Sequence, residues 1–345
     1  MEQLTPLELG SSTGAMMNNV GKVKNTGVEI SLSTVNVQTK NFYWSTTFSF
    51  AKNKNEILEL NGGKEDLIAN KWFIGQPIDV IYDYEYAGVC TAEEAKAYAT
   101  NDAIKTKFIE GEMKLKDQQQ PGEEGYGVID ENDLVVLGHA LPKWTGSVTS
   151  NMTYKNFDFS FSIYTKQGGM VESPFMAEFT NYKDRGRNKL KMDYYIPAGT
   201  PVLNADGSGY TLTTEAHMGA YPYPTNTANN NYGGGIGWGT DKQTTYVGNS
   251  YVNNSFVKIK NITLGYTFPK SWMSKIGVDH LRLYVNVLNP FTFTSYKGFD
   301  PEWAEAALND GTGGPSSRTY QVGVNLKILI PDNHEKSNIY RNLPV

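Results

Sequence analysis

Hydrophobic and polar residues alternate along seven segments of the chain. In the cleanest, residues 157–165, three phenylalanines and an isoleucine alternate with polar side chains. The seven segments are residues 27–38, 42–51, 144–154, 157–165, 255–268, 281–288 and 320–330. Because successive side chains of a strand point to opposite sides, this period predicts strands with one apolar and one polar face.

Two of the predicted strands lose their phase. The alternation slips near Val35 and Val37 in the first strand and near Asn261 in the fifth. One extra residue in a strand shifts its later side chains to the opposite face. The first slip is therefore interpreted as a β-bulge, and the second has the same form.

The connections between these strands alternate between short and long. The short ones are residues 39–41, 155–156 and 269–280, and the long ones are residues 53–143, 166–254 and 289–318. Outer-membrane β-barrels have this arrangement, with short periplasmic turns and long extracellular loops. An antiparallel sheet with one buried face also alternates, but it has no reason to keep its long loops at one end. We therefore predict an all-β chain of about seven antiparallel strands from a large transmembrane β-barrel.

The two faces of the predicted strands have different chemistry. One carries Phe, Trp, Val, Ile and Leu, which suit lipid, and the other carries Ser, Thr, Asn, Gln, Asp and Lys, which suit a wet lumen. Five polar-face residues are the lumen-facing candidates that would line the pore wall. They are Asp158, Tyr164, Arg282, Tyr284 and Asn286.

Composition excludes several other classes of protein. The formal net charge of -5 provides no basic surface for nucleic acid. Cys90 is the only cysteine, so the chain has no internal disulfide and no cysteine-based zinc site. No apolar run reaches the roughly 18 residues that a membrane helix needs. The N-terminus lacks the features of a signal peptide, so we expect either a cytoplasmic protein or a fragment, and the strand pattern favours a fragment.

Four stretches resemble the SusC/RagA family of TonB-linked outer-membrane transporters. They are NVGKVKNTG at 19–27, PKWTG at 142–146, SFVKIKNITLGYTFP at 255–269 and RTYQVGVNLK at 318–327. They lie in the family's order across nearly the whole chain. The resemblance implies the C-terminal part of a barrel of about 22 strands that is closed by an N-terminal plug. It also implies a cell outer membrane location, a SusD-like lipoprotein lid, coupling to the TonB complex, and import of oligosaccharides or peptides.

The resemblance also sets the expected domain limits and two departures. Residues 1–330 would be the C-terminal barrel portion, and residues 331–345 an atypical tail beyond the point where the family usually ends. The plug, the TonB box and the N-terminal strands are not in the sequence. Seven strands with two open edges cannot close a barrel, so the chain alone is expected to be incompetent for transport.

Aromatic residues are frequent in the predicted outer loops. Sugar rings stack on aromatic faces, so five of these residues are loop candidates for ligand contact. They are Trp72, Tyr84, Tyr223, Tyr232 and Trp238. The alternative is that these side chains pack the loops together or contact the lipoprotein lid.

Residues 122–133 resemble a degraded calcium loop. Glu124, Asp130 and Asp133 stand at ligand positions, but Gly122 and Tyr126 occupy two others and supply no carboxylate. A solvated turn is therefore the favoured interpretation, and we expect no metal. Separately, Thr91 and Glu94 have the spacing of a capping box that begins a short helix.

The sequence contains no nucleophile–base motif, and we expect neither an enzyme nor a cofactor. The preferred interpretation is a fragment of a nutrient importer for glycans. The alternative is a secreted or surface β-sandwich that binds carbohydrate. A third hypothesis, a glycoside hydrolase or lyase, would need two carboxylates at a defined separation.

Overall fold

The computed structural model describes most of the chain. The described residues are 2–4, 15–17, 21–100, 110–111, 113–173, 193–222, 251–298, 300–304 and 316–328. The loop candidates Tyr223, Tyr232 and Trp238 and the tail 331–345 lie outside them. No helix in the described part is long and apolar enough to cross a membrane.

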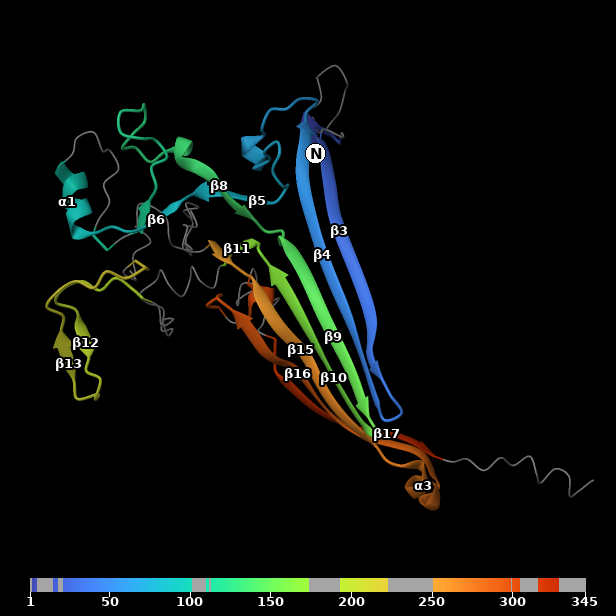
Figure 1. Ribbon diagram of the computed structural model, residues 1–345. Coiled ribbons are helices and arrows are strands. Elements are labelled where there is room, and N and C mark those ends of the chain that lie inside the picture. Colours follow the sequence, from blue (N-terminus) through green and yellow to red (C-terminus); the bar gives the residue numbers. More distant parts are fainter. Residues whose placement is uncertain are drawn as a thin grey trace, which may run out of the picture.

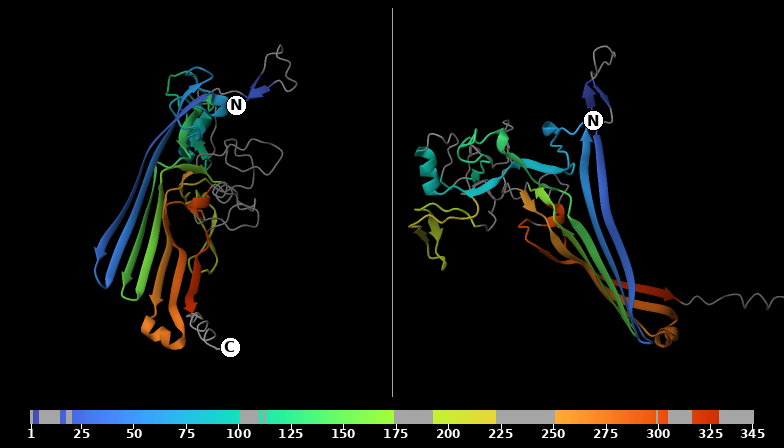
Figure 2. Two further views of the ribbon diagram at one scale, coloured as in Figure 1. Left: turned by 90° about the vertical axis from the view of Figure 1, so that its right-hand side faces the viewer. Right: turned by 45° about the horizontal axis from the view of Figure 1, so that its top comes forward.

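A seven-stranded antiparallel sheet dominates the structure (Figure 1). Its order is β17 (Thr319–Ile328), β16 (Val278–Thr294), β15 (Phe256–Thr267), β10 (Phe157–Gln167), β9 (Trp144–Tyr154), β4 (Phe42–Leu60) and β3 (Gly21–Gln38). These are the seven strands predicted from the alternation. Figure 2 shows that they form one curved wall, with the long loops gathered at one end.

The short and long connections lie at opposite ends of this wall, as predicted (Figure 1). The short end holds α3 (Lys270–Met273) and η4 (Ser274–Ile276). The first long loop contains η2 (Ile68–Asn70), β5 (Val80–Tyr84), β6 (Tyr86–Val89), α1 (Ala92–Thr100), β7 (Met113–Leu115), η3 (Glu131–Asp133) and β8 (Leu134–His139). The second contains β11 (Met170–Glu172), β12 (Pro201–Leu203), β13 (Tyr210–Leu212) and β14 (Tyr251–Asn253), and the third contains η5 (Pro301–Trp303). A separate pair, β1 (Glu2–Leu4) and β2 (Ala15–Met17), precedes the wall.

Both phase slips are register shifts in the sheet. The pairing of β3 with β4 shifts between Val35 and Val37, and that of β15 with β16 shifts between Ile259 and Asn261. Beyond each bulge the side chains resume alternation, so that each strand keeps one polar and one apolar face.

Strands β4 and β16 extend beyond the predicted limits. In β4 the polar run 53–56, which the sequence assigns to a loop, is part of a strand that continues to pair with β3 up to Leu60. Backbone hydrogen bonds hold a ladder together whatever the side chains are, so a loss of hydrophobic alternation does not end a strand. The first outer loop therefore begins later than predicted.

The apolar face of the sheet is open. One row of cross-strand partners runs through Trp44, Met152, Phe159, Leu264, Val285 and Val322. In this row Leu264 is 52%, Val285 48% and Val322 81% exposed. A β-sandwich would cover such a face with a second large sheet, whereas the other sheets in the described residues have two strands each. An exposed apolar face on a single curved sheet is what lipid contact requires.

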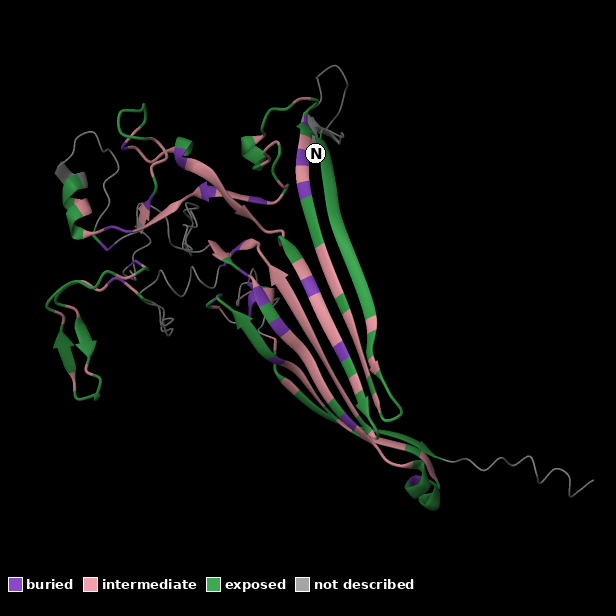
Figure 3. Cartoon of the chain, viewed as in Figure 1, coloured by how far each residue is buried: buried purple, intermediate pink, exposed green. Residues whose placement is uncertain are grey.

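Buried residues are concentrated in the loop layer (Figure 3). Cys90 and Leu115 form one cluster in the first loop, and Val171, Tyr296 and Ala304 form another between the second and third loops. The Thr91–Glu94 capping box begins α1 as predicted, with reciprocal bonds of 3.0 and 3.1 Å. The hydrophobic clusters of buried residues thus lie in the loops, while the seven-stranded wall has one polar and one apolar face.

The three long loops also bind one another through polar contacts. The hydroxyl groups of Ser173 and Tyr296 lie 3.0 Å apart and join the second and third loops. The hydroxyl of Tyr251 donates to Asp83 and joins the second loop to the first. These contacts hold the loops as one layer at one end of the wall.

Candidate functional site

The polar face carries a row of cross-strand partners near the end with the short turns. The sheet register places Asp158 of β10 beside Gly265 of β15, Gly265 beside Tyr284 of β16, and Tyr284 beside Gly323 of β17. Partners in an antiparallel register share a face. The two glycines leave room on either side of the tyrosine for long side chains to lie flat against the sheet.

An ion pair crosses one of these glycines. Arg282 donates from Nε to Asp158 Oδ1 at 2.9 Å and from Nη2 to Oδ2 at 2.5 Å. A Cβ at Gly265 would lie 2.5 Å from both Arg282 Nη2 and Asp158 Oδ1. The guanidinium carbon is also 4.8 Å from the centre of the Tyr284 ring, within reach of a cation–π contact. Glycine at this position therefore allows a bidentate pair to span three strands.

Tyr284 covers the second glycine. Its ring occupies the space that a Cβ of Gly323 would need. An aromatic side chain that packs over a glycine on the neighbouring strand protects the exposed backbone there. The tyrosine is thus fixed between the arginine and β17.

The remaining lumen-facing candidates lie on the same face. Asn286 accepts from the hydroxyl of Thr263 at 2.9 Å and donates to Gln321 at 2.9 Å, which forms a polar ladder over three strands. Tyr164 lies further toward the loops, paired with Lys258. The structure therefore places all five candidates on one polar face, and their contact with a lumen stays a prediction.

A buried ionic cluster lies near the loop end of the polar face. Lys258 is fully buried and binds Asp300 Oδ1 at 3.0 Å and Oδ2 at 2.8 Å. It also donates to Glu302, which accepts from Lys260 as well. Asp300 caps η5 by accepting from the backbone N–H of Glu302 at 3.0 Å. We call Lys258, Lys260, Asp300 and Glu302 the mouth cluster, since it ties the third loop to the wall.

Sequence reasoning did not identify the mouth cluster. Its partners are 42 residues apart and lie in different predicted elements. The available signal was the pair of lysines in the otherwise apolar stretch 256–260, together with the acidic segment at 300–302. The buried ammonium of Lys258 needs anionic partners, and this segment supplies them to Lys258 and to the partly exposed Lys260.

Hydrogen bonds lower the pKa values of the two carboxyl groups in the mouth cluster. Burial alone would raise the pKa of Asp300, but its bonds to Lys258 and Ser316 outweigh burial and hold that pKa below its usual value. In the same way, burial raises the pKa of Glu302, while Lys258 and Lys260 lower it to a net value below the usual one. Both carboxylates are therefore ionised at neutral pH.

We expect the attachment of η5 to be lost only in acid. A lowered carboxyl pKa stabilises the folded form above the unfolded value of about 4, and this contribution disappears as pH falls through the lower folded pKa. A titration of tryptophan fluorescence, with Trp303→Leu as the reference, should show a transition of η5 below pH of about 4. A transition near neutral pH would contradict this prediction.

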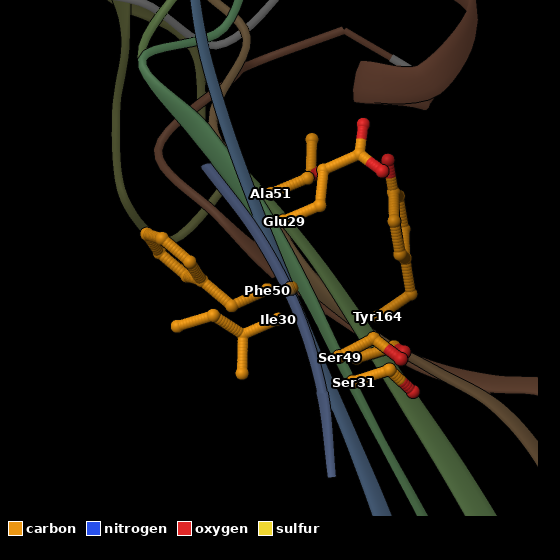
Figure 4. A pocket seen from close by; sticks show the side chains of 10 residues that line it. Glu29, Ile30, Ser31, Ser49, Phe50, Ala51 and Tyr164 are labelled. Carbon is orange, nitrogen blue, oxygen red and sulfur yellow. The ribbon is translucent and has the colours of Figure 1, made fainter. Parts of the chain in front are cut away.

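A shallow hollow of about 510 Å³ lies on the wall between β3, β4, β9 and β10. Figure 4 shows that Glu29, Ser31, Ser49 and Tyr164 point to one side of the sheet, while Ile30 and Phe50 point to the other. Ser147 also lines it. The hydroxyl groups on that side can donate to and accept from a polar ligand.

The two described loop candidates, Tyr84 and Trp72, both form contacts within the first loop. Tyr84 packs against the cluster of Cys90 and Leu115. The backbone of Trp72 pairs with Leu67 through bonds of 2.9 and 3.1 Å. The Tyr84 contact agrees with the packing alternative, the bonds of Trp72 involve its backbone alone, and a ligand role for either residue stays a prediction.

Two acids of the calcium-like segment, Asp130 and Asp133, accept hydrogen bonds from backbone N–H groups. Asp133 is buried and accepts from the N–H groups of Gln118 at 2.7 Å and Asp130 at 2.8 Å. Asp130 caps η3 by accepting from Asn132, and Glu124 is exposed. Within the described ranges, no three His, Cys, Asp or Glu side chains gather as a metal site.

The amino-acid sequence of the chain is similar to those of TonB-dependent receptors. No family model matches the chain. The TonB-dependent receptor P3 of Formosa agariphila is 29% identical over 350 residues, covering 93% of this chain and 30% of the receptor. The TonB-dependent receptor SusC of Bacteroides thetaiotaomicron is 26% identical over 330 residues, covering 93% of this chain and 28% of SusC. The chain thus spans about a third of the length of these relatives.

Solved structures share the fold. The RagAB peptide transporter superposes with a TM-score of 0.61 at 22% identity, over 93% of this chain and 31% of that chain. The RagAB peptide importer in its open-open state gives a TM-score of 0.59 at 21% identity. At this identity the likeness establishes the fold, a segment of such a barrel wall.

These relatives carry the names of receptors and transporters, which agrees with the expectation that the chain is not an enzyme. TonB-dependent receptors are proteins of the outer membrane, so the predicted location is confirmed as well. The resemblance inferred from the sequence is confirmed in both sequence and fold: the chain is SusC/RagA-like, similar in sequence to part of TonB-dependent receptors such as SusC and in fold to part of the RagAB transporter.

Proposed function

We propose that this chain forms the C-terminal part of the barrel wall of a TonB-dependent nutrient importer, with residues 1–330 as that barrel portion. The observation that carries the proposal is the two-sided sheet. One face exposes apolar rows suited to lipid, and the other carries a continuous network of hydroxyl, amide and ionic side chains. A wall between lipid and a wet lumen needs this division.

Oligosaccharides are the proposed substrates. The polar face presents many neutral hydroxyl and amide groups, which match the donors and acceptors of sugars. Peptides are the alternative, because the solved structure with this fold is described as a peptide transporter. A SusD-like lipoprotein over the loop layer and the TonB complex below the wall are the proposed partners, by analogy with the SusC and RagAB relatives.

Deletion of the gene tests the proposal. The mutant should fail to grow on oligosaccharides as the carbon source and should grow normally on the corresponding monosaccharides. Complementation with the intact gene should restore growth. Normal growth of the deletion strain on every oligosaccharide, with impaired growth on peptides, would replace the glycan assignment by a peptide one.

A further inference from the structure

A second hollow of about 440 Å³ lies between the wall and η5, beside the mouth cluster. Its lining combines aromatic and charged side chains from β10, β15, β16 and the third loop. The lining residues are Tyr164, Lys166, Phe256, Lys260, Asn289, Glu302, Trp303 and Ser316. It shares Tyr164 with the hydroxyl-lined hollow of Figure 4, so the two form neighbouring parts of one surface.

The acids of this region are already neutralised. Asp300 binds Lys258, and Glu302 binds both Lys258 and Lys260. Lys166, by contrast, forms no ion pair with any residue in the described part of the chain. Around this hollow three lysines therefore stand against two carboxylates, which leaves an excess of positive charge there, while the carboxylate of Glu29 lies in the adjoining hollow.

Trp303 is presented to this hollow by a fixed backbone. Its neighbours in the loop are buried, with Asp300 6% and Ala304 3% exposed, whereas Trp303 is 51% exposed. Its backbone N–H also donates to the carbonyl of Asp300 at 3.0 Å. Because the backbone of this segment is already held in place, Trp303 would lose little further conformational freedom when it binds a ligand.

We propose that this hollow is a subsite for a carboxylate-bearing sugar of the imported oligosaccharide, an inference that rests on the proposed function. Lys166 Nζ and the Tyr164 hydroxyl donate to the carboxylate. The ring of Trp303 stacks on the apolar face of the sugar. The adjoining hydroxyl-lined hollow takes the next sugar unit through Ser31, Ser49 and Ser147.

The subsite is tested by titrating saccharide probes into the protein and measuring the heat of binding. The protein is purified from outer membranes in the form that the cell makes. The probes are tri-galacturonate and its fully methyl-esterified form, which has the same sugar rings and linkages but no charged carboxylates. Lys166→Met keeps the aliphatic stem and removes the charge, and Trp303→Leu removes the ring. Lys275→Met and Trp272→Leu, at exposed positions near the short turns, are the matched controls.

The acid should bind about tenfold more weakly to Lys166→Met, the effect of one hydrogen bond to a charged group. The ester should bind Lys166→Met and wild type within about twofold of each other, and Trp303→Leu should weaken both probes. Both controls should bind like wild type.

Equal binding of acid and ester, or an affinity for the acid that Lys166→Met leaves unchanged, overturns the subsite and leaves the proposed glycan import intact. Tri-glutamate is the third probe. Binding of tri-glutamate in a Lys166-dependent manner, with no binding of either saccharide, would overturn the sugar subsite and the glycan assignment together in favour of peptides. Absence of binding by all three probes would also overturn the subsite.

Discussion

Replacement of Asp300 by alanine should release η5 from the barrel wall. The substitution leaves the fully buried ammonium of Lys258 with Glu302 as its one remaining carboxylate and removes the cap of η5. Breaking a buried ion pair by removing one partner costs about 3–5 kcal/mol, and we expect the lower end because Glu302 remains.

Hydrogen exchange measured by mass spectrometry tests this expectation. The backbone amides of residues 300 and 302–304 should lose about 100-fold in protection, the equivalent of about 3 kcal/mol. Asp300→Asn retains a side-chain oxygen that can cap η5 but removes the charge, so it separates the two contributions. Asp206→Ala, in an exposed turn of the β12–β13 hairpin, is the surface control.

A compensating variant makes the prediction stricter. Lys258→Met combined with Asp300→Leu removes both charges and keeps apolar volume. Replacement of a whole buried ion pair by apolar residues is often neutral, so most of the lost protection should return. If Asp300→Ala leaves the protection of η5 unchanged, the mouth cluster does not hold the loop to the wall.

Gly265→Val should destabilise the wall and break the Asp158–Arg282 pair. The nearest atoms to an added Cβ are the charged ends of these two side chains at 2.5 Å, so a branched side chain forces both away from the sheet. Overpacking of this kind costs about 1–3 kcal/mol. Urea unfolding in detergent, followed by tryptophan fluorescence, measures the loss.

The cost of Gly265→Val should depend on the ion pair. In a background with Asp158→Ala and Arg282→Ala, the space is empty and the valine should be tolerated. Gly21→Val is the strand control, because its nearest neighbours lie at the ordinary contact distances of 3.4 and 3.5 Å. An equal cost of Gly265→Val in both backgrounds would show that the crowding lies elsewhere.

The strands and their two faces follow from the sequence alone. Alternation is a local property, since each residue's face depends only on its position in the strand. For this reason the sequence predicts the seven strands and both bulges. It also predicts which face of the sheet carries Asp158, Arg282, Tyr284 and Asn286. The alternating loop lengths likewise fixed which ends of the strands lie together.

The ends of the strands and the packing of the loops could not be predicted from the alternation of hydrophobic and polar residues. The polar end of β4 pairs through backbone groups that carry no side-chain signal. Tyr84 was a candidate for ligand contact, and only the fold placed it against Cys90 and Leu115. In loops no period relates a side chain to its neighbours, so the sequence could not distinguish packing from exposure.

The tertiary structure decided which side chains act together. The sequence placed Asp158 and Arg282 on one face, but only the register shows that the pair spans the glycine between them. Likewise, Lys258 is a surface-type residue in the sequence, and the return of the third loop buries it against Asp300. Alternation is set by neighbours along the chain, whereas these contacts join residues 42 and 124 positions apart, and only closure of the intervening chain brings them within hydrogen-bonding distance.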